Sequence, residues 1–116
     1  MEIKPYISQI ELYEWYVNTD YNTITLYFEA PKEMLNGKYP EAEFMTISVE
    51  FPIDHYDARY SSVSCSPTRY YPEDDAYSDY DWFDVDMSYE DIEKLFYMAE
   101  KTRGMAPAEW KKHIKN

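Results

Sequence analysis

Apolar and polar side chains alternate along several stretches of the first 87 residues. The clearest alternation covers residues 44–51, which end at a proline. A period of two is typical of a strand with one buried face, and proline cannot donate a hydrogen bond to a neighbouring strand. We therefore predict a strand here whose buried face carries Met45, Ile47, Val49 and Phe51.

Two earlier runs predict an antiparallel hairpin. Residues 7–17 are rich in β-branched and aromatic side chains, and residues 23–28 alternate between apolar and polar positions. The sequence Asn18-Thr19-Asp20 between them is typical of a turn. In the first run, we place Ile10 and Leu12 on one face and Glu11, Tyr13 and Trp15 on the other.

The later pattern is weaker. Residues 31–40 and 66–72 carry prolines and turn formers and are predicted as loops, and residues 59–65 as an edge strand or a fourth strand. Residues 81–87 predict a fifth strand, because Phe83, Val85 and Met87 alternate with polar or aromatic positions. Its outer face would be acidic, with Trp82, Asp84 and Asp86.

The last part of the chain has a helical pattern. Ser88 is a suitable N-cap, and Gly104 is a suitable residue to end the helix. An apolar stripe lies between them, made of Ile92, Leu95, Phe96 and Ala99. A short last helix would start at Pro107. We predict a single α+β domain, 1–116, with strands over 1–87 and helices over 88–116: an antiparallel sheet of about four to five strands covered by one amphipathic helix plus the short last helix.

Charge excludes several classes of function. Acids number 23 and bases 11, so the net charge is -12, which argues against direct binding to a nucleic-acid backbone. Two glycines exclude the glycine-rich phosphate-binding loops. Residues 1–93 carry a charge of -16 and residues 94–116 a charge of +4. We expect the basic end to neutralise part of the acidic sheet; the alternative is a second contact surface around Trp110, with Lys111, Lys112 and Lys115.

Candidate catalytic and metal-binding residues are sparse. Cys65 with His55 or His113 lacks any flanking nucleophile signature, and we expect Cys65 to be a half-buried strand residue. One cysteine and two distant histidines cannot form a zinc site, and the acids after Asp79 lack the central glycine of a calcium loop. We predict neither enzyme activity nor a cofactor. The lone cysteine and the absence of a long apolar run predict a cytoplasmic protein without a membrane partner.

The strongest functional signal is an acidic stretch over residues 73–91. It holds nine acids and no base, with aromatic residues between them, whereas disordered acidic tails have few aromatics. We therefore expect it to be folded. The alternative is that these acids only solvate a surface. The predicted partner-binding residues are Glu73, Asp74, Asp75, Tyr77, Asp79, Tyr80, Asp81, Trp82, Asp84 and Asp86.

The spacing of these acids suggests mimicry of nucleic acid. Carboxylates two residues apart on a strand lie about 6.6 Å apart, as Asp79 with Asp81 and Asp84 with Asp86 would, and neighbouring phosphates lie roughly 7 Å apart. Further acids that could extend the surface are Glu11, Glu14, Glu41, Glu43 and Glu50. The 14 tyrosines favour a docking surface, because tyrosine is frequent at interfaces.

In composition and layout the chain resembles phage-encoded inhibitors that mimic nucleic acid. We predict a non-enzymatic inhibitor of a basic nucleic-acid-binding protein, such as a restriction, CRISPR-type or recombination nuclease, or a transcription or nucleoid protein. One alternative is an immunity-type protein that binds a single toxin. Another is a structural or assembly subunit whose tyrosines form a homodimer or larger interface.

Overall fold

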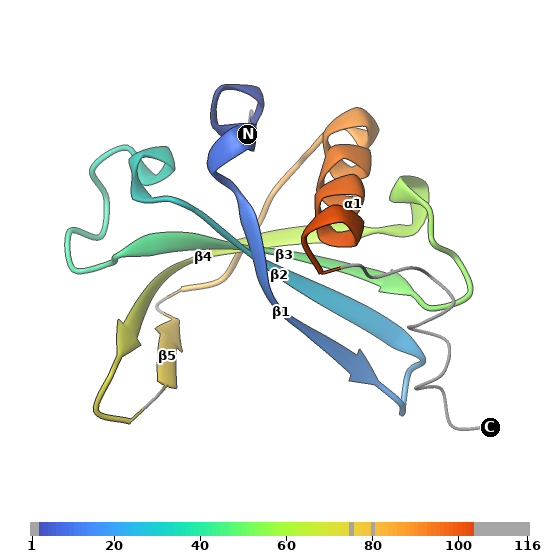
Figure 1. Cartoon of the computed structure of the whole chain (residues 1–116), viewed down its shortest axis with the longest axis horizontal. Helices are drawn as coiled ribbons and strands as arrows, with labels where there is room; N and C mark the ends of the chain where they lie inside the picture. The colour runs from blue at the N-terminus through green and yellow to red at the C-terminus, as the bar shows by residue number, and fades with distance from the viewer. Residues whose placement is uncertain (1–2, 75, 80, 104–116) are drawn as a thin grey trace.

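The computed structural model describes residues 3–74, 76–79 and 81–103. Five antiparallel strands pair in the order in which they occur along the chain, and a short sixth strand is a further partner of β4 (Figure 1). The strands are β1 (Glu11–Asn18), β2 (Thr23–Pro31), β3 (Phe44–Pro52), β4 (Ser62–Tyr71), β5 (Ala76–Asp79) and β6 (Phe83–Asp84). The helices are α1 (Tyr89–Arg103) and the 3-10 turns η1 (Lys4–Gln9), η2 (Lys32–Leu35) and η3 (Ala58–Tyr60). The fold is α+β, as the sequence predicts.

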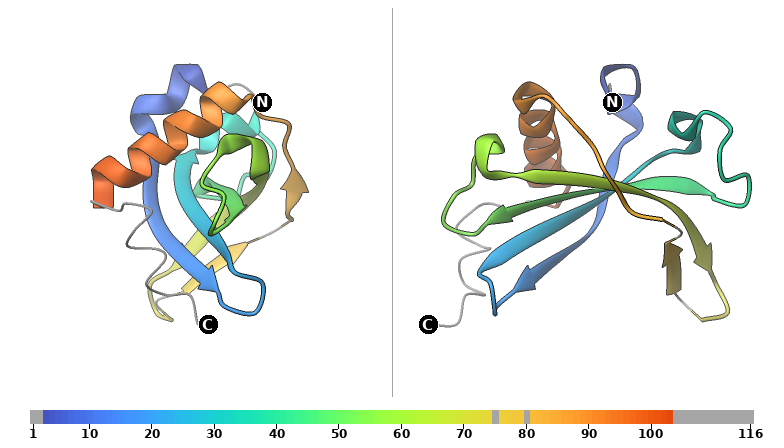
Figure 2. Two further views of the ribbon diagram at one scale, coloured as in Figure 1. Left: turned by 90° about the vertical axis from the view of Figure 1, so that its right-hand side faces the viewer. Right: turned by 180° about the vertical axis from the view of Figure 1, so that it is seen from behind.

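The sheet has two unlike faces. Residues directly opposite each other in paired strands share a face, so the register defines both faces. The core face lies under α1 and η1, which stand together on one side of the sheet (Figure 2). Its strand residues are Leu12, Trp15, Val17, Ile24, Leu26, Phe28, Ala30, Met45, Ile47, Val49, Phe51, Val63 and Cys65. We call the opposite side the open face.

Helix α1 covers the core face as the sequence predicts. Its apolar stripe is buried, namely Ile92, Leu95, Phe96 and Ala99. The hydroxyl of Ser88 accepts a hydrogen bond from the backbone N–H of Asp91 at 3.2 Å, which confirms Ser88 as the N-cap. The predicted short last helix and the predicted helix end at Gly104 lie outside the described residues.

The predicted first strand is wrong at its beginning. Residues 7–9 belong to η1, and β1 starts at Glu11. Pro5 stands at the start of η1, where its fixed backbone angle suits a helical turn, and the N–H of Tyr6 bonds to the carbonyl of Ile3 at 2.9 Å. The prediction gave weight to the β-branched residues and overlooked this proline.

A β-bulge at Tyr13 changes the faces of β1. Leu12 lies opposite Phe28, but the next pair is Glu14 with Tyr27, so Tyr13 is the extra residue. Beyond the bulge, Trp15 pairs with a core-face residue and packs against the core. The prediction that Trp15 shares a face with Glu11 is therefore wrong, because the inserted residue shifts the alternation by one position.

Strand β4 extends through the segment that the sequence predicts as a loop. The predicted hairpin is confirmed as β1 with β2, and β4 pairs with β3 along residues 62–68. Residues 59–60 belong to η3, however, and residues 66–71 are strand, so the predicted loop over 66–72 is wrong. Pro67 is buried inside a paired strand, which propensity alone does not predict.

Pro67 also explains why the next strand is broken in two. The carbonyl of Val63 accepts from Val85, and that of Thr68 accepts from Glu43 on the β3 side. The N–H and C=O groups of even-numbered β4 residues therefore point toward β3, and those of odd-numbered residues point to the opposite side. On that side Pro67 has no N–H to donate. β5 pairs with residues 68–71 and β6 with residues 64–65, on either side of this position.

Two other segments differ from prediction. The predicted loop over 31–40 holds the end of β2 and the turn η2, followed by Asn36 and Gly37 with positive φ angles of 54° and 79°. The predicted strand over 81–87 is reduced to β6. Its alternation persists in part, because Met87 is buried and Val85 packs against the core, whereas Phe83 is exposed.

Candidate partner-binding surface

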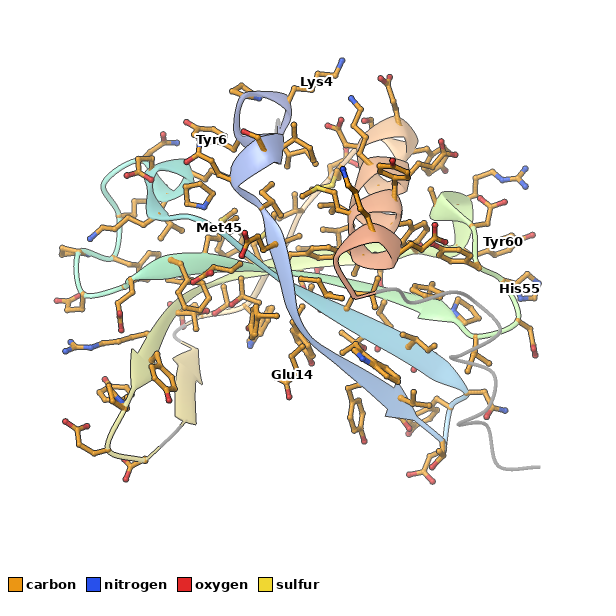
Figure 3. The ribbon with its side chains drawn as sticks, in the orientation of Figure 1. Lys4, Tyr6, Glu14, Met45, His55 and Tyr60 are labelled. Carbon is orange, nitrogen blue, oxygen red and sulfur yellow. The ribbon has the colours of Figure 1, made fainter. Side chains whose placement is uncertain are left out.

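The open face carries polar and aromatic side chains instead of an apolar layer. Its strand residues, read from the register, are Glu11, Glu14, Tyr16, Asn18, Thr23, Thr25, Tyr27, Glu29, Phe44, Thr46, Ser48, Glu50, Ser62, Ser64, Ser66 and Thr68. Figure 3 shows Met45 on the α1 side of the sheet and Glu14 on the opposite side. Hydroxyls, rings and carboxylates therefore occupy the face that α1 does not cover.

An aromatic cluster stands on this face, formed by Tyr13, Tyr27, Phe44 and Trp82. The ring of Tyr13 meets Phe44 edge-on at 5.8 Å and Tyr27 at 6.3 Å. Trp82 packs edge-on against Tyr27 at 6.4 Å and remains 44% exposed. These contacts bring the segment before β6 across the open face. They also leave a large ring accessible there, which is typical of an interface anchor.

A chain of hydroxyls lies beneath the aromatic cluster. The Tyr13 hydroxyl lies 3.0 Å from Thr46 Oγ1, which in turn lies 2.6 Å from Thr68 Oγ1. Thr68 donates to the carbonyl of Ser66, so the direction of the chain runs from Tyr13 through Thr46 to Thr68. Thr46 and Thr68 are fully buried. Because buried hydroxyls are costly when unpaired, this chain fixes the cluster in one arrangement.

Three carboxylates lie close to one another at one end of the open face. Glu11 lies directly opposite Glu29 in the register, and Glu43 is close enough to act on the same residue. Partial burial raises the pKa of Glu29, and repulsion from Glu11 and Glu43 raises it further. Within the part of the chain that the structure describes, no ion pair within 4.0 Å involves Glu11, Glu14, Glu29, Glu43 or Glu50.

The predicted acidic segment lies beside this face. Asp81 is exposed and accepts a hydrogen bond from the Tyr39 hydroxyl at 3.3 Å, and Asp84 is exposed in β6 opposite Ser64. Neither has an ion-pair partner among the described residues. Asp86 is exposed in the connection to α1.

Four other predicted residues of the segment lie in the turn after β4 or in β5. Glu73 and Asp74 are exposed in the turn between β4 and β5. Tyr77 and Asp79 are positions of β5 whose backbone pairs with Tyr70 and Thr68. Asp75 and Tyr80 lie outside the described residues.

The predicted phosphate-like pairs need correction. Asp79 ends β5 and Asp81 lies beyond it, whereas Asp84 ends β6 and Asp86 lies beyond that strand. Neither pair shares one strand, so the spacing of about 6.6 Å between alternate strand residues does not apply to them. The interruption opposite Pro67 is the physical reason for the first pair.

Sequence reasoning missed Glu29 and the ring contacts around Tyr27. Glu29 continues the polar side of the alternation that starts at Thr23, so extending that run by one residue would have found it. The ring contacts of Tyr27 are tertiary and have no such signal. Of the acids named as extending the surface, Glu11, Glu14, Glu43 and Glu50 lie on or beside the open face, and Glu41 is exposed in the turn before β3. The Thr25 hydroxyl donates to Glu50 at 3.3 Å.

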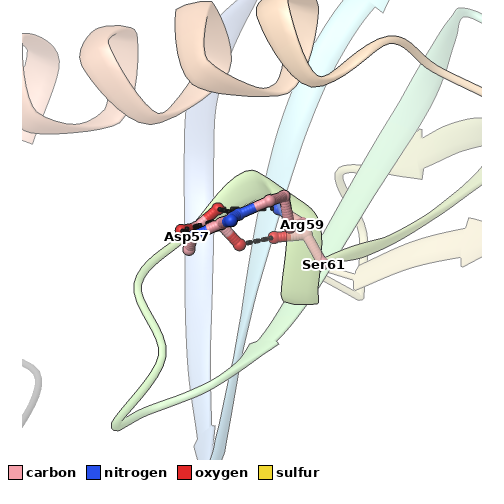
Figure 4. Close-up of polar contacts among 3 residues, drawn as sticks. All are labelled: Asp57, Arg59 and Ser61. Atoms are coloured by element: carbon pink, nitrogen blue, oxygen red, sulfur yellow. Dashed lines mark hydrogen bonds and ion pairs between the residues drawn. The ribbon is translucent and has the colours of Figure 1, made fainter.

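The candidate nucleophile Cys65 and the candidate base His55 lie away from the open face. Cys65 is fully buried on the core face, not half-buried, and burial raises the pKa of its thiol to about 12. His55 is exposed against the Tyr60 ring at 4.5 Å. Nearby, Asp57 accepts from Arg59 at 2.7 Å and caps η3, and these bonds lower the pKa of Asp57 to about 2 (Figure 4).

A metal cluster and a membrane-spanning helix are both lacking in the described part of the chain. Among residues 3–74, 76–79 and 81–103, no group of three histidine, cysteine or acidic residues is placed to hold a metal ion. None of the described helices has the length and apolar character needed to cross a membrane.

Comparisons with known proteins add no assignment. The chain matches no protein-family model, and neither the curated proteins nor the solved structures contain a match.

Proposed function

We propose that this chain is a non-enzymatic inhibitor that covers the nucleic-acid site of a basic protein with its open face. The carboxylates of the open face and of the adjoining segment, residues 81–86, would stand where that site receives phosphates. The aromatic cluster would anchor the contact.

The observation that carries the proposal is that no described carboxylate of the open face forms an ion pair within 4.0 Å. Glu11 and Glu29 face each other across two strands, and repulsion contributes to the raised pKa of Glu29. Like charges placed opposite each other destabilise a sheet. Surfaces that serve solubility alone mix both signs. A basic partner would relieve this repulsion on binding, and its association would be fast and sensitive to salt.

One specific observation favours the immunity-type alternative. Trp82 is exposed beside the carboxylates of Asp81 and Asp84. Exposed aromatic anchors dominate interfaces with one dedicated partner, and salt screens them less than it screens exposed charges. The salt dependence of binding therefore separates the two hypotheses.

The test compares two variants that each lose three negative charges. The open-face variant carries Glu14→Gln, Glu29→Gln and Asp84→Asn. The matched control carries Asp20→Asn, Asp54→Asn and Glu93→Gln, all of them exposed acids without an ion pair in the described chain. Each immobilised protein captures partners from a nuclease-treated bacterial lysate, which are eluted with a salt gradient and identified by mass.

We expect the unchanged chain and the control to retain nucleic-acid-binding proteins that elute at low salt and compete with duplex DNA. The open-face variant should lose them while its unfolding curve stays cooperative. Equal retention by both variants would refute the proposal. Retention of one partner that resists high salt and does not compete with DNA would establish the immunity-type alternative instead.

A further inference from the structure

The connection between β2 and β3 contains an Asn36-Gly37 turn that the proposed function does not use. The N–H of Lys38 donates to the carbonyl of Leu35 at 3.1 Å, which closes a turn around the pair. Asn36 and Gly37 have φ angles of 54° and 79°, as the central residues of a type I′ turn require. Both residues are exposed, and their loop projects from the end of the sheet (Figure 1). Water therefore reaches the turn freely.

This pair of residues has the chemistry of deamidation. The backbone nitrogen of the residue after an asparagine can attack Cγ of the asparagine side chain, and a side chain on that next residue hinders the attack. Gly37 has no side chain, and beyond its chain neighbours no atom lies within 4 Å of the place where a Cβ would stand. Within the described part of the chain, no hydrogen bond holds the Gly37 N–H. The attacking nitrogen is therefore unhindered.

The turn also has the freedom that ring closure needs. Closure requires rotation about the Cα–C bond of Asn36, whose ψ angle is 41°. Glycine at the next position accepts a wide range of backbone angles. The hydrogen bond from Lys38 to Leu35 lies in an exposed turn, and such bonds open locally at a low cost in free energy.

Two other asparagines of the described chain lack this combination. Asn22 has a similar φ angle of 51°, but it is followed by Thr23, a β-branched residue that begins β2. The carbonyl of Asn22 accepts a hydrogen bond from Ile53 at 2.9 Å, which opposes rotation. The side-chain oxygen of Asn18 accepts from the N–H of Asp20 at 3.0 Å. These two residues therefore serve as internal references.

We propose that Asn36 is a site of spontaneous modification, at which asparagine converts to isoaspartate and aspartate. Hydroxide removes the proton of the Gly37 N–H, and the nitrogen attacks Cγ of Asn36. The new N–Cγ bond closes a succinimide ring as the Cγ–Nδ2 bond breaks, and the nitrogen of the side chain leaves as ammonia. Water then adds to one of the two ring carbonyls and breaks its bond to the Gly37 nitrogen. Opening at Cγ gives aspartate, and opening at the backbone carbonyl gives isoaspartate.

The modification changes both charge and backbone next to the proposed binding surface. Either product adds a negative charge to the turn. Isoaspartate also routes the backbone through its side-chain carbon, which lengthens the path between Leu35 and Lys38. The next residue, Tyr39, donates a hydrogen bond from its hydroxyl to Asp81 at 3.3 Å. The altered turn therefore leads directly into a contact with residues 81–86.

The test follows deamidation in the full chain by mass spectrometry during incubation at neutral and at alkaline pH. Trypsin releases residues 33–38, so Asn36 is measured separately from Asn18 and Asn22, which lie in a longer peptide before it. Deamidation replaces an amide with a carboxyl group and raises the peptide mass, and chromatography separates isoaspartate from aspartate. Thr23→Gly places a glycine after Asn22 within the paired strand and is the matched control. Each chain is also incubated unfolded in guanidinium chloride.

We expect Asn36 to convert at least about tenfold faster than Asn18 and Asn22 in the folded chain, because glycine leaves the nitrogen open to attack. Both products should form, and the rate should rise with pH because the deprotonated nitrogen is the nucleophile. A stable Asn36, equal rates at the three asparagines, or aspartate without isoaspartate would each overturn the proposal.

The glycine variant separates the effect of the turn from that of the sequence. In folded Thr23→Gly, Asn22 should remain slower than Asn36, whereas in the unfolded chain the two rates should agree within about twofold, because the restraint of the strand is lost. Equal rates in the folded variant would overturn the role assigned to the exposed turn. The comparison within the unchanged chain decides the proposal even where the variant does not fold.

Discussion

On the core face, strand residues are closed over by α1 and packed side chain against side chain. Phe51, for example, meets Phe96 at 5.1 Å and Tyr56 at 5.5 Å. On the open face of the same strands, most side chains carry a hydroxyl, an aromatic ring or a carboxylate. The core face is optimised for burial, and the open face keeps repulsive charge that folding does not need. This difference supports the proposal that the open face binds a partner.

The largest expected effect distinguishes an aromatic residue of each face. Phe51→Ala should lower the free energy of unfolding by about 3–5 kcal/mol, because it opens a cavity in the packed core. Trp82→Ala should lower it by about 1.5 kcal/mol or less, since the ring is half exposed and has one edge-on contact in the described chain. Urea unfolding measures both. Equal losses would break the distinction between the faces.

The next effect tests whether the open face has an ordered interior of its own. Thr46→Val should cost about 1–3 kcal/mol, because it removes the buried hydroxyl that links Tyr13 to Thr68 and with it two hydrogen bonds. Thr46→Ser keeps the hydroxyl and serves as the control. If urea unfolding shows the valine variant to be as stable as the serine variant, the hydroxyl chain does not support this face.

A third prediction concerns the cover of the core face. Ser88→Ala should destabilise the chain by about 1 kcal/mol, because the N–H of Asp91 loses its acceptor at the start of α1. Ser88→Asp keeps a capping oxygen and should restore the stability. The measurement is the midpoint of thermal unfolding followed by circular dichroism. An unaffected alanine variant would show that packing alone holds α1.

The smallest effect is a pH dependence at Glu29. The folded-state pKa of this residue lies above its unfolded value, so its ionised form destabilises the fold at neutral pH. Glu29→Gln should therefore be slightly more stable at pH 7, within about 0.5 kcal/mol as for most surface substitutions. The gain should vanish as the pH falls below the ordinary carboxyl range. A loss of stability at pH 7 would mean that Glu29 has a favourable partner.

The periodicity of apolar residues predicted correctly those strands and helices whose backbone is regular. β3 and α1 follow their sequence patterns because each keeps one period from beginning to end, with Met45 and Leu95 buried as expected. The prediction failed where one residue interrupts the period. Tyr13 adds a position to β1, Pro5 turns the chain into η1, and Pro67 lies inside a strand whose partners avoid it.

The candidate surface was predictable in its chemistry and not in its geometry. Composition pointed to the acids of residues 73–86, and Asp81 and Asp84 are indeed exposed there. The repulsion between Glu11 and Glu29 and the contact of Trp82 with Tyr27 depend on which residues the fold brings together. Such contacts have no signal in local periodicity.

The order of the strands bears on how the chain is made. Each strand from β2 to β5 pairs with the strand synthesised before it, so each pairing closes a single connection. Low sequence separation between contacts favours rapid folding. α1, however, packs against β1 from the other end of the described chain. On the ribosome the sheet emerges first, and its core face stays uncovered until the helix arrives, so early folding is the stage at which this acidic chain is most exposed to aggregation.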